Sequence, residues 1–164
     1  LIPCYGCGAL VPNEDGPIHR YIGASPGCWA LYGEVLARGY GTPGFGDDDL
    51  MIINSYAVQH PGTSSPRSIQ SVGAHLIGLY VVEERGYDGK RALEAVRIAA
   101  DGSRAFHWLE PPPNRYGITI LDIHRAADPA AHTAAMRVMA ETTWAAWSAH
   151  QPQVRAWAAE LGLP

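Results

Sequence analysis

The stretch Cys4-Tyr5-Gly6-Cys7-Gly8 is the part of the chain around which the rest is organised. Two thiolates that are two residues apart can converge on one metal ion, and the glycine that follows permits the tight turn beneath them. Two ligands do not complete a tetrahedral site, so further donors must come from elsewhere in the sequence. The stretch therefore predicts a metal-binding knuckle made by Cys4 and Cys7.

Cys28 is the predicted third ligand, because it falls in the first turn of a helix that Ser25-Pro26 is expected to open. Free backbone N–H groups and the positive end of the helix dipole favour a thiolate there.

The fourth ligand is chosen among three histidines. We favour His19, since it would close a local Cys3His site, and keep His60 or His75 as alternatives that would tie the amino-terminal loop to the helices. Mixed thiolate and imidazole ligands select Zn²⁺ over Mg²⁺ or Ca²⁺, so zinc is the expected ion.

Composition points to one globular domain over residues 1–164, with a Cys-containing loop at 1–27 packed on a helical body at 28–164. The 164 residues are 47% hydrophobic and 17% charged, which is enough apolar material for one core. Three cysteines cannot all pair as disulfides, and a Cys-x-x-Cys pair in a reducing compartment is usually a metal or redox element. No strand-helix-strand pattern surrounds Cys4, so a thioredoxin-like motif is not expected.

Charge and hydropathy narrow the class of partner. The net charge of −4 and the absence of a Lys/Arg cluster argue against nucleic acid, and no apolar run reaches the ~20 residues that cross a bilayer. We expect a cytoplasmic protein whose partner is a small-molecule ligand, with no nucleic acid and no membrane.

Capping residues and apolar spacing predict an all-α protein, an irregular or orthogonal bundle of five to six helices with a metal-stiffened amino-terminal loop. Residues 118–123 are ambiguous, because their β-branched side chains favour a strand whereas Thr119 and Asp122 favour a short helix. The expected helices are 26–38, from the acidic run at 47–49 to about 60, 66–85, 88–101, 129–151 and 153–161.

His60, His75 and Asp49 are the candidates for acid/base chemistry. Helical spacing places His60 on the apolar face of its helix, and Ser71 and Gly78 leave room around His75. Imidazole titrates near neutrality, so these side chains are suited to proton transfer or to a second metal, with Asp49 as a helper. The alternative is a pair of core histidines satisfied by hydrogen bonds.

The sequence contains a set of distinctive motifs, which are CxxCGA at 4–9, HRY at 19–21, SPGCWA at 25–30, YAVQHPG at 56–62, SIQSV with HLIGL at 68–79, and WLEPP at 108–112. Together these motifs resemble an uncharacterised bacterial family that is known only as a domain of unknown function. The resemblance implies a small soluble protein that stands alone, and it brings no established activity or catalytic residue. Members often have His where this chain has Asp49, so a carboxylate here would change metal preference or pKa.

Two functions follow from these patterns. The first is a zinc-binding helical protein with a binding or scaffold role, since no nucleophile, base and orienting residue can be assembled from spacing. The alternative is a zinc-dependent small-molecule enzyme of hydrolase or lyase type, with His60 and His75 in a pocket near the metal. The number of protein ligands separates them, because catalytic zinc keeps an open position.

Overall fold

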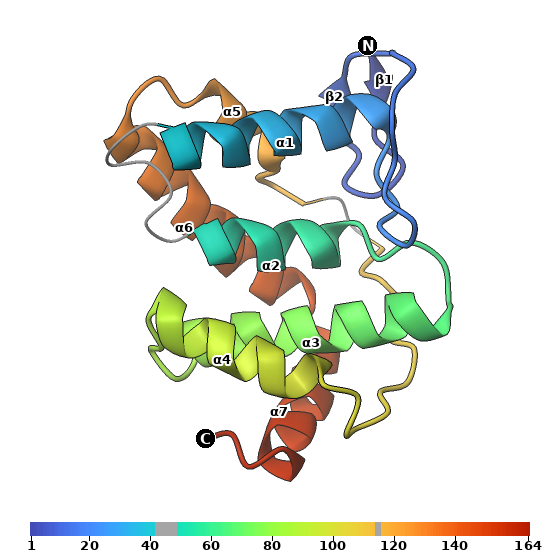
Figure 1. Ribbon diagram of the computed structural model, residues 1–164, viewed down its shortest axis with the longest axis vertical. Helices are drawn as coiled ribbons and strands as arrows, with labels where there is room; N and C mark the ends of the chain where they lie inside the picture. The colour runs from blue at the N-terminus through green and yellow to red at the C-terminus, as the bar shows by residue number, and fades with distance from the viewer. Residues whose placement is uncertain (42–48, 114–115) are drawn as a thin grey trace.

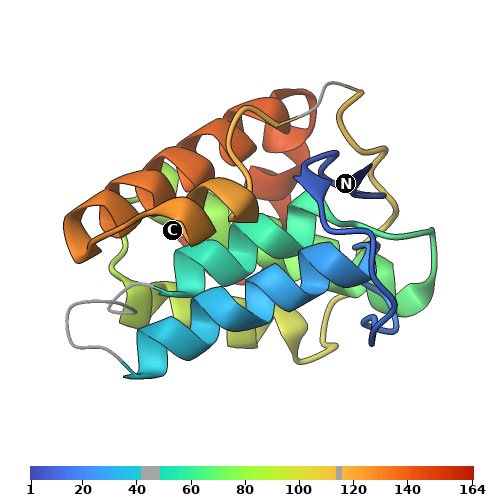
Figure 2. The same ribbon diagram turned by 90° about the horizontal axis from the view of Figure 1, so that it is seen from above.

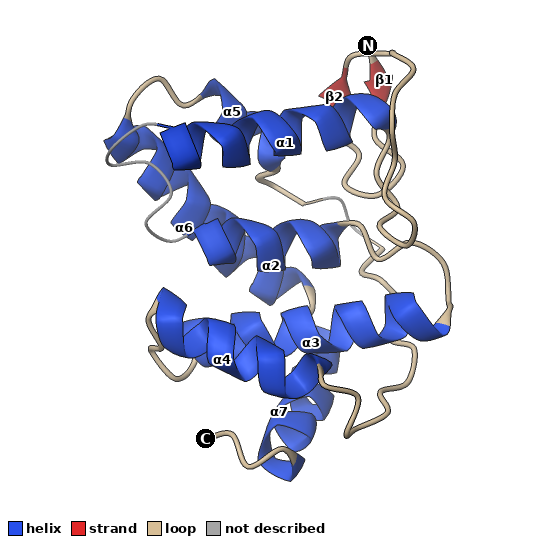
Figure 3. Cartoon of the chain, in the orientation of Figure 1, coloured by secondary structure: helices blue, strands red, loops and turns tan. Residues whose placement is uncertain are grey.

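The computed structural model describes residues 1–41, 49–113 and 116–164. In these residues the regular structure is helical apart from two short strands, β1 (Ile2–Pro3) and β2 (Leu10–Val11), which pair antiparallel (Figure 3). The prediction of a helical protein is confirmed. The predicted number of helices is too low, because the described residues form seven α-helices and one 3₁₀ turn.

Most helices follow the predicted ranges, but the helix expected over 129–151 ends at Ala146 and a 3₁₀ turn follows it. The ambiguous stretch at 118–123 enters a short helix at Ile120. There the backbone N–H of Thr119 donates to Asp122 Oδ2 at 2.8 Å, which starts the short helix. The helices are α1 (Pro26–Gly41), α2 (Asp49–Gln59), α3 (Pro66–Glu83), α4 (Gly89–Ala100), α5 (Ile120–Arg125), α6 (Pro129–Ala146), the 3₁₀ turn Ser148–His150 and α7 (Gln151–Glu160). Asp49 is the first residue of α2, and the rest of the expected acidic start, 47–48, lies outside the described residues.

Side-chain caps explain where three helices begin. Ser65 Oγ accepts the Ser68 N–H at 3.2 Å, and Asp88 and Asp128 accept the N–H groups of Arg91 and Ala131 at 2.9 and 2.8 Å. Each cap satisfies a backbone donor that the first helical turn leaves without a partner. These starts were read correctly from the sequence.

The helices stack in layers. In Figure 1, α1, α2 and α3 lie one above another and alternate in direction, with α4 in front of α3. Figure 2 shows α6 on the far side of α2, against which it packs. As a result, the start of α1 and the end of α2 lie on the same side of the molecule as the amino-terminal hairpin.

Buried apolar side chains form two clusters, and α2 contributes to both. Ile52 and Tyr56 belong to a cluster with α1, α5 and the cysteines, whereas Val58 belongs to a cluster built on α3, α4 and α7. The end of α2 is thereby fixed from two sides. Among the described helices, none is both long enough and apolar enough to cross a membrane.

Candidate metal centre

The amino-terminal hairpin presents Cys4 and Cys7 at its turn. Ile2 pairs with Val11 and Pro3 with Leu10, and the Cys4 N–H donates to the carbonyl of Ala9 at 2.8 Å. Gly8 has φ of 75° and donates its N–H back to the Cys4 carbonyl at 3.1 Å. A left-handed residue is needed to close this turn, which explains the glycine after the second cysteine.

Cys28 comes from α1, as predicted, and is the third residue of that helix. The hairpin lies directly on this end of α1, because a Cβ atom on Gly27 would collide with the carbonyl of Pro12. Glycine therefore permits the backbone contact that brings the third sulfur to the other two.

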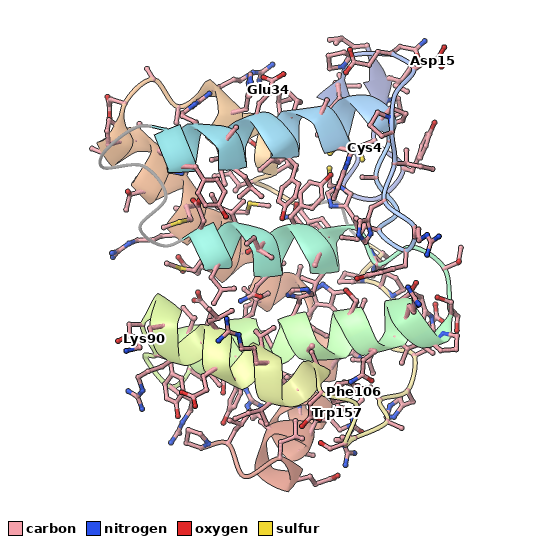
Figure 4. The ribbon with its side chains drawn as sticks, viewed as in Figure 1. Cys4, Asp15, Glu34, Lys90, Phe106 and Trp157 are labelled. Atoms are coloured by element: carbon pink, nitrogen blue, oxygen red, sulfur yellow. The ribbon has the colours of Figure 1, made fainter. Side chains whose placement is uncertain are left out.

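His60 follows the last residue of α2, and its carbonyl accepts the Gly23 N–H at 3.0 Å. Gly6, inside the Cys-x-x-Cys motif, packs on its ring, since a Cβ atom there would lie 2.6 Å from His60 Cδ2. Figure 4 shows Cys4 near the start of α1 and above the end of α2. The hairpin, α1 and α2 therefore meet at one point.

The four side chains form a compact group. The Sγ atoms of Cys4, Cys7 and Cys28 and a ring nitrogen of His60 all lie within 4.8 Å of one another, close enough to hold one metal ion. Cys28 Sγ lies 3.4 Å from His60 Nε2 and 3.9 Å from Cys7 Sγ. The residues are between 0% and 3% exposed, so the group is shielded from solvent.

Tyr56 supports two members of the group. Its carbonyl accepts a hydrogen bond from His60 Nδ1 at 2.7 Å. In the neutral ring Nε2 therefore carries the lone pair, and this nitrogen faces the Cys28 sulfur at 3.4 Å. The Tyr56 hydroxyl donates to Cys28 Sγ at 3.6 Å. Tyr56 was not among the predicted site residues, although its spacing of four residues from His60 places both side chains on one helical face.

The electrostatics of the four side chains suit a bound cation. Hydrogen bonds from Cys28 and Cys7 hold the pKa of the Cys4 thiol far below its usual value, whereas hydrogen bonding to Cys4 and Cys7 raises the pKa of Cys28. Burial works against a charge on His60, but contact with the thiolates raises its pKa to about 9. A divalent ion among these side chains would stabilise the thiolate of Cys28, whose pKa the neighbouring sulfur atoms raise.

The donor set fits Zn²⁺. Three thiolates and one neutral imidazole form a known type of structural zinc site, and the bond from His60 Nδ1 to a backbone carbonyl is the usual outer-shell support of a ligating histidine. Cys4, Cys7, Cys28 and His60 are the residues that would hold the ion.

His19, the favoured fourth ligand, is not a member of this group, and His60 takes its place. The His19 ring packs against the rings of Tyr21 and Trp29, with centroids 4.4 and 5.2 Å away. Short spacing along the chain favoured His19, but the turn of the hairpin points its cysteines toward the end of α2. The fourth member of the group is therefore a histidine from a segment distant in sequence, and not the nearby His19.

His75 and Asp49 also lie apart from the four side chains. His75 Nδ1 donates to Asn54 Oδ1 at 2.8 Å, in the contact between α2 and α3. Asp49 begins α2, whereas His60 follows its end, so about 16 Å of helix separates them. The expected grouping of His60, His75 and Asp49 in one pocket is not present.

A cleft of about 470 Å³ lies beside the knuckle. It is bordered by Cys4, Gly6, Gln59 and Tyr116, with the wall formed by residues 111–113. The cleft is within the size range of small-molecule sites.

Comparisons with known proteins place the chain in a family. Searches of curated proteins and of solved structures returned no match. Residues 2–148 match a family of unknown function, DUF5946, and these residues include the four side chains of the candidate metal centre. The match covers most of the 164 residues, and the chain therefore belongs to the DUF5946 family.

Proposed function

We propose that the protein binds one Zn²⁺ ion through Cys4, Cys7, Cys28 and His60, and that the ion holds the amino-terminal loop on the helical body. The observation that carries the proposal is the convergence of three sulfur atoms and one imidazole nitrogen within 4.8 Å, from three separate segments. Such a site would be structural, because four protein ligands fill the tetrahedral coordination of zinc.

The role of a binding protein agrees better with this geometry than that of a zinc hydrolase or lyase. A catalytic zinc needs an open position for water or substrate, whereas His60 is 0% exposed and its Nε2 faces the sulfurs. Residues that could transfer protons, such as His75, do not face the four side chains. The cleft beside Cys4 is then a surface for a ligand next to a rigid knuckle.

The test is metal analysis of protein purified from medium with added zinc. We expect about one zinc per chain and X-ray absorption with three Zn–S distances of about 2.3 Å and one Zn–N distance of about 2.0–2.1 Å. Substituting cobalt should give the visible absorption of a tetrahedral thiolate site.

Two variants make this test specific. His60→Ala should lose zinc or bind it with altered absorption, whereas His19→Ala should retain one zinc per chain. Wild-type protein without stoichiometric metal would contradict the proposal, and loss of zinc from His19→Ala alone would show that the fourth ligand is assigned incorrectly.

A further inference from the structure

A second cavity, of about 340 Å³, lies between α3 and α4 and shares no residue with the metal centre. Its polar lining comes mainly from α3, where Arg67, Ser71 and His75 follow one another at intervals of four residues. That spacing places the three side chains on one face of the helix, over about 12 Å. Ala74 and Val96 add an apolar surface.

A hydrogen bond to Asn54 fixes the orientation of the His75 ring. Nδ1 donates this hydrogen bond to Oδ1 of the buried Asn54, so Nε2 carries a free lone pair. No hydrogen bond to Nε2 is present among the described residues. Burial lowers the pKa of His75 to about 4, so the ring is neutral near pH 7. Nε2 is therefore a hydrogen-bond acceptor available to a ligand in the cavity.

The hydrogen bond with His75 uses only the oxygen of the Asn54 side-chain amide. Its side chain is 0% exposed, and Nδ2 has no hydrogen-bond partner among the described residues. A buried N–H group without a partner destabilises the folded protein, which argues against a purely stabilising role for the pair. Gly78 leaves the space for this amide, because a Cβ atom there would lie 2.5 Å from Nδ2.

The other end of the stripe carries a positive charge. Arg67 is exposed and takes part in no ion pair within the described part of the chain. Its guanidinium can bind a carboxylate or phosphate with two parallel hydrogen bonds. Ser71, between Arg67 and His75, can donate to an oxyanion or accept from a hydroxyl.

We propose that this cavity binds a small organic oxyanion, a carboxylate or phosphate ester, that also carries a hydroxyl group. Arg67 and Ser71 would hold the oxyanion, and His75 Nε2 would accept a hydrogen bond from the hydroxyl group. Sulfate carries no proton near neutral pH and would leave the lone pair of His75 unused, so the cavity should prefer a hydroxylated anion to sulfate.

The proposal is tested by NMR titration of the zinc-loaded protein with four probes: glycerol 3-phosphate, glycerate, sulfate and glycerol. We expect saturable shifts of the His75 ring and the Ser71 amide with glycerol 3-phosphate or glycerate. Sulfate should bind at least about tenfold more weakly, and glycerol should not saturate.

Variants separate the two ends of the cavity. Arg67→Gln should weaken binding at least about tenfold, whereas Arg97→Gln, an equal loss of charge on α4 at a different surface depression, should leave it within about twofold. His75→Gln should reduce the preference for glycerol 3-phosphate over sulfate.

Three results would overturn the proposal. They are the absence of saturable shifts in the folded wild-type protein with either hydroxylated probe, equal weakening by Arg67→Gln and Arg97→Gln, and equal affinity for glycerol 3-phosphate and sulfate. The zinc content of each sample is measured separately, so failure of the metal site and failure of this cavity give different results.

Discussion

At the scale of single residues, Tyr56 supports two of the four proposed zinc ligands. Its carbonyl orients the His60 ring through Nδ1, and its hydroxyl donates to Cys28 Sγ. The side chain is 1% exposed and stacks on the ring of Tyr32, with centroids 4.0 Å apart. The hydroxyl would reduce the charge density on the Cys28 thiolate without leaving the apolar cluster.

Replacing Tyr56 with Phe should weaken zinc binding by about 10- to 100-fold, the usual effect of losing an outer-shell hydrogen bond. The substitution removes the donor to Cys28 and keeps the aromatic ring, and the backbone contact to His60 is unchanged. Competition with a chromophoric chelator measures the affinity.

Tyr32→Phe is the matched control for this substitution, because Tyr32 stacks on Tyr56 and belongs to the same cluster. The zinc affinity of Tyr32→Phe should stay within about threefold of wild type, a smaller change than the one expected for Tyr56→Phe. Equal affinities in Tyr56→Phe and wild type would show that the hydroxyl does not support the ligand.

At the scale of elements, the hairpin depends on contacts that only glycine allows. Gly6→Ala would place a methyl group against the ring of His60 and the carbonyl of Gln59, at 2.6 and 2.9 Å. The hairpin would have to move away from α2, so we expect a loss of about 1–3 kcal/mol in the free energy of unfolding and weaker zinc binding. Thermal unfolding with excess zinc measures the first effect.

Gly33→Ala gives the comparison for Gly6→Ala. Gly33 lies inside α1, and a Cβ atom there would meet nothing within 4 Å. The change should raise stability by up to about 1 kcal/mol, because alanine favours the helix. If both variants behaved alike, the contact between the hairpin and His60 would not be the cause.

The helices could be predicted because their signals are local. Ser65, Asp88 and Asp128 cap the helices that the sequence assigned to them, and apolar spacing gave the buried faces. The stretch at 118–123 was ambiguous because β-branched residues and a capping box sent opposite signals, and the capping interaction of Thr119 with Asp122 decided it.

The complete ligand set could not be predicted, because the signal for its fourth member is not local in the sequence. Cys4, Cys7 and Cys28 carry a local signal, whereas the choice between His19 and His60 depends on where α2 ends relative to the hairpin. That position follows from packing between segments that are distant in sequence, such as Gly6 on His60. Spacing along the chain contains no information on that contact.

At the scale of the whole molecule, zinc should stabilise one part of the protein more than another. Removing the ion should increase amide exchange in residues 1 to about 30, which the knuckle holds, more than in α7, which packs on α3. At a free zinc concentration of about 1,000 times Kd, the ion contributes about 4 kcal/mol, or roughly 10 °C in Tm. Hydrogen exchange with and without chelator checks the pattern, and uniform loosening would contradict it.

The His75 imidazole should make stability depend on pH. Burial lowers its pKa to about 4, below the usual value of about 6.5, so between these values the unfolded chain binds a proton that the folded protein does not. Stability contributed by the neutral ring is therefore present above pH about 6.5 and is lost as the pH falls toward 4.

Denaturant unfolding at several pH values, with the zinc concentration held constant, compares wild type with His75→Gln. The stability of wild type should fall more steeply between pH 6.5 and 4, because the variant lacks the titrating ring. Parallel curves would mean that His75 is equally free to take up a proton in both states.

The order of the proposed ligands along the chain has a consequence for biosynthesis. Ribosomes deliver the chain from its amino end, so Cys4, Cys7 and Cys28 emerge before His60, which Cys28 precedes by 32 residues. Until that imidazole leaves the exit tunnel, the nascent chain exposes three thiols to oxidants and to competing thiophilic ions. Helix α6, which packs on α2, is made later still, so correct metallation during translation would depend on how the early thiols are protected.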